Sequence, residues 1–364
     1  MIEVLSSTAL ATVQDLGRSG ALRWGVGTSG AMDPMALAAG NLMLGNDEAA
    51  AAIELQVFPF EVRFTASGAF ALTGADTDAS LDGRPLLPWW RHEAHAGQVL
   101  RLNVPRRATA WSACRAYLCL PGGVDVPVVL GSRSTQMRGA FGGHEGRTLR
   151  PGDRLAAGRS EAPCGGSRAG FGLVPPAMAI PLLADGLPAV RVLPAAEIAA
   201  YEEASRAAFW TRPWKITPQS DRYGYRLAGE PLRAASPMEM RSHGIVPGVI
   251  QVPPGGQPIV QMRDAQPSGG YPKVGTIIEA DLWRLGQAPI GSSLRFVETT
   301  WAEAVAALDA NRAWLDEARR LVGLWLAGAP ARAAHSAANT GTATTAPQRA
   351  RAPTRQRPTQ RTTA

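Results

Sequence analysis

The sequence has few residues of the kinds that form disulfides or bind metals. Its 364 residues include five scattered histidines and three cysteines, Cys114, Cys119 and Cys164. The cysteines form no CxxC pair and their number is odd, which indicates a reduced, cytoplasmic compartment rather than a disulfide framework. No histidine pair has the HxxxH spacing of a zinc site, so we expect no metal centre.

Long apolar runs are also absent, and we expect no N-terminal leader. The N-terminus, MIEVLSS, carries an acid at Glu3 and lacks the apolar region of a signal peptide. No apolar run approaches the length needed to cross a bilayer. The sequence therefore predicts a protein that does not interact with membranes.

Outside one segment the chain has little net positive charge. The formal net charge is +7, but residues after Pro330 carry no acid and contain Arg332, Arg349, Arg351, Arg355, Arg357 and Arg361. The rest of the chain is close to neutral and gives no electrostatic support for nucleic-acid binding. The low-complexity composition of residues 329–364 predicts a disordered tail.

Glycine and proline are abundant, with 39 and 29 residues, which favours a turn-rich β architecture. We predict a mainly β protein of two β-barrel or sandwich halves with a few helices. The halves are residues 1–160 and 189–328, joined by a linker at 161–188. Strands are expected at Ile2–Leu5, Ala11–Val13, Phe60–Phe64, Ala69–Thr73, Val99–Val104, Trp111–Leu120, Pro127–Leu130, Ala189–Leu193 and Trp214–Thr217.

The clearest helix signal is Asp33 before Pro34, an N-cap oxygen followed by a preorganised first turn. Asn41 would lie on the apolar face of this helix. There its amide either satisfies loop carbonyls or contacts a ligand. Further helices are expected at Ala195–Trp210 and from the capping box Thr300–Glu303 to Leu326.

The stretch His243–Ile278 is the most informative for function. Two apolar runs, Gly248–Val252 and Pro258–Met262, flank a Pro-Pro-Gly-Gly turn and predict a β-hairpin. A third apolar run follows at Val274–Ile278. The Gly-rich loop between the second and third runs carries polar and ionisable groups, which is typical of a functional site.

Lys273 is the main catalytic candidate in this loop. It is one of two lysines among 37 basic residues, and its ammonium can polarise an amide carbonyl or bind an oxyanion. Asp264 could pair with that ammonium, accept a proton, or cap its own turn. Neutral donors suited to a small polar substrate are offered by Gln266, Ser268 and Tyr271. His243 could titrate near neutrality, and Asp221 with Arg222 predicts a local ion pair that positions a loop.

Several segments, in order, resemble one family: Thr12–Arg18, Ser29–Asp33 with Asn41, Gly122–Pro127, Leu130–Thr135, Ser220–Arg222, Ile250–Pro254, Asp264–Gln266 and Gly269–Lys273. They are similar to the allophanate hydrolase subunit 2 family, also called the biotin-dependent carboxyltransferase family, which includes the C subunit of bacterial 5-oxoprolinase. The family's usual Gln-Thr-Thr-Gly-Gly is Gln-Pro-Ser-Gly-Gly here, and Pro267 removes a backbone donor. Ser29 and Asn41 fall in the matching N-terminal motifs and are expected to bind substrate. Supporting roles are expected for Asp33, Asp221, Arg222 and His243.

The resemblance implies cyclophilin-like barrel halves and a role beside a kinase-inhibitor-like subunit, with a lactam-utilisation-type subunit as a possible third member. Such complexes open 5-oxoproline to glutamate at the expense of ATP. Relatives within urea carboxylase transfer a carboxyl group from biotin to urea, and there the residues matching Asp264 and Lys273 lie at the active site. Neither lysine here has the Met-Lys-Met setting of a biotinyl lysine, so no biotin is expected on this chain. A non-enzymatic antagonist of the kinase-inhibitor-like partner is a further alternative.

Overall fold

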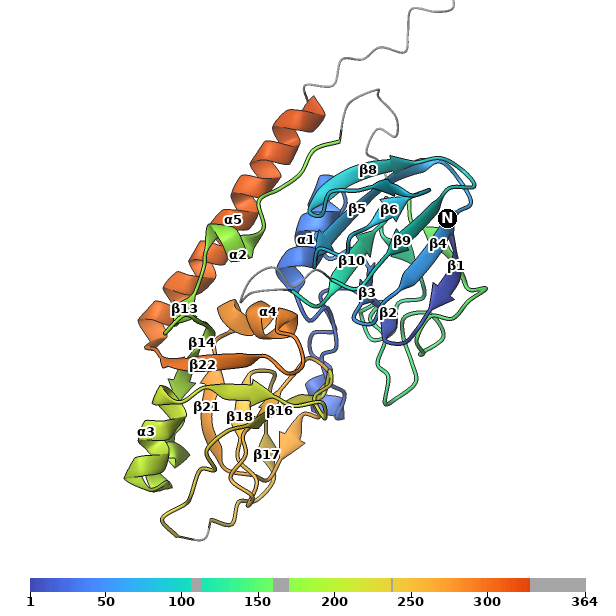
Figure 1. Cartoon of the computed structure of the whole chain (residues 1–364). Coiled ribbons are helices and arrows are strands. Elements are labelled where there is room, and N and C mark those ends of the chain that lie inside the picture. The colour runs from blue at the N-terminus through green and yellow to red at the C-terminus, as the bar shows by residue number, and fades with distance from the viewer. Residues whose placement is uncertain (106–112, 160–169, 237, 328–364) are drawn as a thin grey trace, which may run out of the picture. The chain divides into compact units, whose positions relative to one another are not determined.

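The computed structural model describes residues 1–105, 113–159, 170–236 and 238–327 (Figure 1). Its first part consists of two antiparallel sheets. In spatial order, the seven-stranded sheet contains β11 (Val124–Asp125), β12 (Arg154–Ala157), β1 (Ile2–Ser7), β4 (Phe60–Phe64), β9 (Val99–Leu102), β6 (Ser80–Leu81) and β7 (Arg84–Pro85). The five-stranded sheet contains β2 (Ala11–Gln14), β3 (Ala52–Leu55), β10 (Ala116–Cys119), β5 (Gly68–Gly74) and β8 (Trp90–Ala94).

These two sheets share one hydrophobic core, which makes the first part a β-sandwich. The alternation along β4 shows how the sequence specifies the inner face: Phe60, Val62 and Phe64 are buried, whereas Glu61 and Arg63 point outward. Apolar residues of the five-stranded sheet, on β2, β3, β5 and β10, belong to the same buried cluster.

The second part contains an eight-stranded sheet that closes on itself. Its spatial order is β13 (Leu183–Ala184), β14 (Leu187–Pro194), β21 (Lys273–Ile277), β18 (Val249–Gln251), β19 (Ile259–Gln261), β16 (Gly224–Ala228), β15 (Trp214–Ile216) and β22 (Ser293–Glu298). Because β22 also pairs with β14, in parallel, the strands from β14 to β22 form a closed barrel. A separate two-stranded ribbon is formed by β17 (His243–Gly244) and β20 (Ser268–Gly269).

The helices are η1 (Leu22–Trp24), α1 (Pro34–Met43), α2 (Pro176–Ala179), η2 (Ala196–Ala200), α3 (Glu203–Thr211), α4 (Glu279–Gln287) and α5 (Trp301–Ala327). No helix in the described part of the chain is long and apolar enough to span a bilayer.

Helix α5 contacts elements of both parts (Figure 1). Near its first turns it packs on α4, where Asn311 Nδ2 donates to the carbonyl oxygen of Ala280 at 2.9 Å. Further along, Val322 is buried in a cluster with Leu37 of α1. The last helix therefore completes a core that begins near the N-terminus.

The mainly β prediction and its barrel and sandwich halves are confirmed, as are the hairpin of β18 and β19 and the third strand β21. The predicted strand Pro127–Leu130 is wrong, because Val129 makes only an isolated bridge across a turn to Ser132. The predicted helix Ala195–Trp210 is two helices, interrupted where Tyr201 is extended and bridges to Ala234. Helix α4 was not predicted.

The boundaries at residues 160 and 189 remain predictions, and the predicted linker contains α2 and β13. Residues 111 and 112 of one predicted strand, residues 161–169 of the linker and the predicted disordered tail lie outside the described residues.

Candidate functional site

Two rows of side chains run across neighbouring strands of the barrel, next to the predicted Gly-rich loop. The inner row is fully buried in the core and consists of Tyr225, Val260 and Ile250. Side chains alternate between the two faces of a sheet, so the next row points away from that core. The outer row consists of Arg226, Ile259, Gln251 and Lys273. A bulge between Ile250 and Gln251 brings Lys273 into this row.

The Gly-rich loop lies directly against the outer row. Gln261 Nε2 donates to Gln251 Oε1 at 3.0 Å, and Gln251 Nε2 donates to the carbonyl oxygen of Tyr271 at 3.3 Å. A Cβ atom at Gly269 would lie 2.7 Å from Gln251 Nε2, so a side chain there would displace the end of that glutamine. The glycine therefore lets the loop backbone approach the glutamine amide without moving it.

This arrangement borders a polar cavity of about 550 Å³. Its lining residues are Arg138, Gln219, Asp221, Tyr223, Gly224, Arg226, Gln251, Ile259, Gln261, Gln266, Gly269, Gly270 and Tyr271. Of the predicted site residues, Gln266, Tyr271 and Asp221 line this cavity. Arg138 reaches it from the first part of the chain.

Lys273 is the first residue of β21 and is partly accessible, with 29% of its side chain exposed. Its Nζ atom lies 3.8 Å from Glu197 Oε1 on η2. A partly exposed ion pair at this separation is weak. The ammonium, which has three N–H donors, therefore remains able to bind a ligand.

Asp264 is buried and has a different partner from the predicted one. Its carboxylate accepts hydrogen bonds from Arg222 Nε at 2.9 Å and from Arg222 Nη2 at 3.1 Å, and the residue is 1% exposed. The predicted pairing of Asp264 with Lys273 is therefore not formed. The predicted local pair of Asp221 with Arg222 is also wrong, because Asp221 Oδ1 caps its own turn by accepting from Tyr223 N and Gly224 N.

Arg222 joins the barrel to the sandwich. Besides Asp264, it donates through Nη1 to Glu54 Oε1 of β3 at 2.5 Å and through Nη2 to the carbonyl oxygen of Gly30 at 2.7 Å. Although burial opposes the charge, the carboxylates of Asp264 and Glu54 hold the pKa of Arg222 above its usual value. Glu54 Oε2 in turn accepts from the Tyr117 hydroxyl at 2.7 Å.

Asp33 extends this buried network. Its Oδ1 accepts from Ala36 N at 2.9 Å, which confirms the predicted N-cap of α1. Its Oδ2 accepts from Gln287 Nε2 at 2.8 Å, and Gln287 Oε1 accepts from Arg115 N at 2.8 Å. Burial raises the pKa of Asp33 to about 6, despite the hydrogen bonds that it accepts and with a small contribution from Glu54.

The raised pKa of Asp33 predicts a pH-dependent stability. Between pH ~4 and ~6 the native state holds a proton that the unfolded state has lost, so the unfolding free energy falls as pH rises, by roughly 3 kcal/mol from this group. Asp33→Asn retains a cap oxygen but cannot ionise. Denaturant unfolding at several pH values should therefore show the variant gaining stability relative to the unsubstituted protein as pH rises through this window. Parallel curves for the two proteins would contradict the assignment.

Ser29 and Asn41, both predicted to bind substrate, are buried and do not line the cavity. Asn41 Nδ2 donates to the carbonyl oxygens of Glu48 and Ala50, so the alternative that it satisfies loop carbonyls is confirmed. Ser29 has a left-handed backbone with φ of 51°, and its Oγ atom has no hydrogen-bond partner among the described residues.

His243 and Ser268 lie in the two-stranded ribbon of β17 and β20. The Nδ1 atom of His243 lies 3.0 Å from the carbonyl oxygen of Arg241. Ser268 is exposed. Neither residue lines the cavity, although Gly269 of the same ribbon and Tyr271, two residues later, do.

Four residues of the network and the cavity were not predicted from the sequence: Glu54, Tyr117, Arg115 and Arg138. Glu54 has a recognisable signal, because it is a single acid within the apolar run Ala49–Phe60. An isolated acid in a buried strand needs a partner. The sequence contains no comparable signal for Arg138, which is one of many loop arginines.

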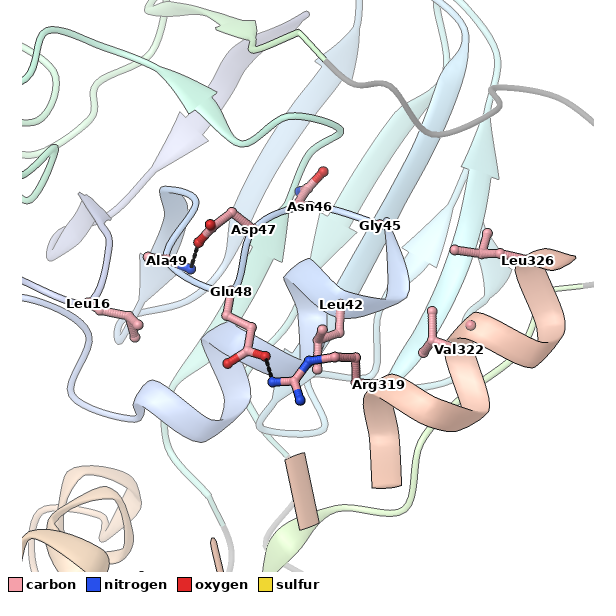
Figure 2. Close-up of a pocket in the computed structure, with 11 residues that line it drawn as sticks. Leu16, Leu42, Gly45, Asn46, Asp47, Glu48, Ala49, Arg319, Val322 and Leu326 are labelled. Carbon is pink, nitrogen blue, oxygen red and sulfur yellow. Dashed lines mark hydrogen bonds and ion pairs between the residues drawn. The ribbon is translucent and has the colours of Figure 1, made fainter. Parts of the chain in front are cut away.

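A second cavity, of about 620 Å³, lies between the loop after α1 and the last turns of α5 (Figure 2). Glu48 and Arg319 form an ion pair across it, and Val322 lies on its helical side. No predicted site residue lines this cavity. The described residues also include no group of three or more His, Cys, Asp or Glu side chains that could hold a metal ion.

Comparisons with known proteins identify the family. The model for "Carboxyltransferase domain, subdomain A and B" matches residues 24–298. The chain is 40% identical to the C subunit of 5-oxoprolinase from Haemophilus influenzae, over 88% of this chain and 99% of that protein. It is also 40% identical to the C subunit of 5-oxoprolinase from Escherichia coli, over 87% and 97% respectively.

A solved structure, urea amidolyase of K. lactis, is similar with a TM-score of 0.76 and 27% identity. The match covers 87% of this chain and 20% of that much longer protein. The region that the family model matches includes the barrel strands from β14 to β22, the Gly-rich loop, Asp264 and Lys273. The chain belongs to the family of carboxyltransferase domains with subdomains A and B.

Proposed function

We propose that this chain is a subunit of a cytoplasmic complex that hydrolyses 5-oxo-L-proline to L-glutamate with concomitant hydrolysis of ATP. The observation that carries the proposal is the match to proteins named as the C subunit of 5-oxoprolinase, which extends over nearly their whole length. A cavity lined by amides and phenols, with a lysine in the adjoining row, suits a small cyclic amide as substrate.

Lys273 is assigned the catalytic role. Hydrolysis breaks the ring C–N bond: water supplies the hydroxyl to the carbonyl carbon and a proton to the nitrogen. Negative charge develops on the carbonyl oxygen as water adds, and the ammonium of Lys273 would stabilise it. Asp264 is assigned a positioning role, because both of its oxygens are held by Arg222.

The complex is proposed to include a kinase-inhibitor-like subunit and a lactam-utilisation-type subunit. ATP belongs to the proposal at the level of the complex, and no residue of this chain is assigned to it. Lys273 does not line the cavity itself, but it is partly exposed and pairs across the strands with Gln251, which does; this supports a site that a partner surface completes.

Co-expression of the chain with both partner subunits tests the proposal. The purified complex should release glutamate from 5-oxo-L-proline only when ATP is present, and the chain alone should release none. Turnover by the isolated chain would contradict the subunit assignment, and an inactive complete complex would contradict the proposed reaction.

A second candidate function is carboxyl transfer to a urea-like substrate, with biotin carried by a partner. It is favoured by the 32% identity to urea amidolyase of Lachancea kluyveri, although this chain covers only 17% of that protein. Transfer of carboxyl from a biotinylated partner to urea by this chain, without glutamate release from 5-oxo-L-proline, would establish it.

A further inference from the structure

Two arginines that line the polar cavity form no ion pair with any described residue. They are Arg226 on β16 and Arg138 in the first part of the chain. Both are exposed, and neither matches a family motif identified in the sequence. Guanidinium groups facing a cavity without a carboxylate partner can bind an anion there.

Arg226 stands at one end of the outer row and Lys273 at the other, with Ile259 and Gln251 between them. Neighbouring strands are about 4.8 Å apart, so the backbones at the two ends are roughly 14 Å apart. Because both side chains are long and flexible, their charged ends can approach one small molecule from opposite sides. A ligand with a carbonyl near Lys273 would present its other end to Arg226.

Arg138, which lies in a tight turn, contributes a second positive charge to the cavity lining. Gln136 and Phe141 pair across the turn, and Gly139 N donates to Gln136 Oε1 at 2.6 Å. The guanidinium of Arg138 lies over the ring of Tyr223, 5.7 Å from its centroid. The stacking directs the side chain toward the cavity wall that Tyr223 forms.

The charge of the cavity lining favours an anion. Of its described lining residues, Asp221 is the one carboxylate, against two guanidinium groups. Asp221 Oδ1 already accepts two backbone N–H groups. Gln261 donates to Gln251, which in turn donates to the loop carbonyl of Tyr271, and both amides are neutral, so they do not offset the positive charge.

We propose that Arg226 and Arg138 bind the carboxylate of the substrate, so that the site selects an acidic lactam over a neutral amide such as urea. The planar guanidinium fits a carboxylate in a bidentate arrangement. This inference rests on the proposed function for the identity of the lactam. It adds the residues that recognise the second functional group of that molecule.

Binding measurements on the co-expressed complex test the inference. Calorimetric titration would compare 5-oxo-L-proline with its primary carboxamide, which has the same ring and no carboxylate. Arg226→Gln and Arg138→Gln should each weaken binding of 5-oxo-L-proline by about 10- to 100-fold, as expected for loss of a charged hydrogen bond. Binding of the carboxamide should change by less than about threefold, which shows that the cavity is intact. Arg206→Gln, on the exposed face of α3, is the matched control and should change neither affinity.

The results of these measurements distinguish a failure of the carboxylate site from a failure of the proposed reaction. If the complex releases glutamate but both arginine variants bind 5-oxo-L-proline normally, the carboxylate site is overturned and the reaction stands. If 5-oxo-L-proline binds in an arginine-dependent way without turnover, the carboxylate site stands and the reaction is overturned. Equal weakening of both ligands would show a general loss of structure and overturn the carboxylate assignment.

Discussion

Lys273→Ala should lower the turnover of 5-oxo-L-proline by the assembled complex by about 10²- to 10³-fold, the usual effect of losing one donor to a developing oxyanion. The loss should appear in kcat, because the interaction strengthens as charge develops on the carbonyl oxygen. Stability should change by less than about 1 kcal/mol, since the side chain is partly exposed and its pair with Glu197 is weak. Steady-state kinetics and denaturant unfolding measure the two effects separately.

The sequence provides a matched control for Lys273, because Lys215 is the other lysine of the chain. Lys215 lies on β15 with its side chain exposed and does not line the cavity. Lys215→Ala should retain full activity. If the Lys273 and Lys215 variants have similar rates, the catalytic assignment is wrong.

Arg222→Met should destabilise the protein by about 3–5 kcal/mol, because it leaves the buried carboxylates of Asp264 and Glu54 without their cation. The volume is nearly conserved, so the lost charge is the main cause. Because Glu54 belongs to the sandwich and Asp264 to the barrel, the variant should also weaken the contact between the two parts and lower activity. Chemical denaturation gives the stability change directly.

A second substitution distinguishes the buried charges from simple loss of packing. Adding Asp264→Asn to Arg222→Met removes one unpaired carboxylate, so the double variant should cost clearly less than the sum of the two single changes. Arg212→Met removes an exposed arginine that pairs with Glu230 at 3.8 Å, and it should change stability by less than about 0.5 kcal/mol. Additive costs at Arg222 and Asp264 would contradict the buried network.

Local patterns predicted the part of the fold that holds the site. The hairpin of β18 and β19 was predicted because two short apolar runs flank a Pro-Pro-Gly-Gly turn, and β21 because an apolar run follows a Gly-rich loop. Gly269 was part of the predicted loop, but its close approach to Gln251 on another strand was not predicted. The sequence therefore predicted which residues form the loop, but not how the loop lies against Gln251.

Long-range partners account for what was predicted incorrectly. Asp264 is nine residues from Lys273 in the sequence, which favoured that pairing. Its partner in the structure is Arg222, which is 42 residues away and also binds Glu54. The predicted helix across Tyr201 failed for a similar reason, because the backbone there bridges to Ala234 and the ring is buried in the barrel core. Neither partner can be recognised until the strands are arranged in space.

Helix α5 affects the order in which the protein folds during synthesis. Val322 belongs to the same buried cluster as Leu37 of α1, yet the ribosome makes it nearly 300 residues later. While the chain is being translated, the apolar face of α1 therefore lacks its last covering element. Nascent chains stalled before α5 should expose this face to chaperones, and release of the finished chain should close it.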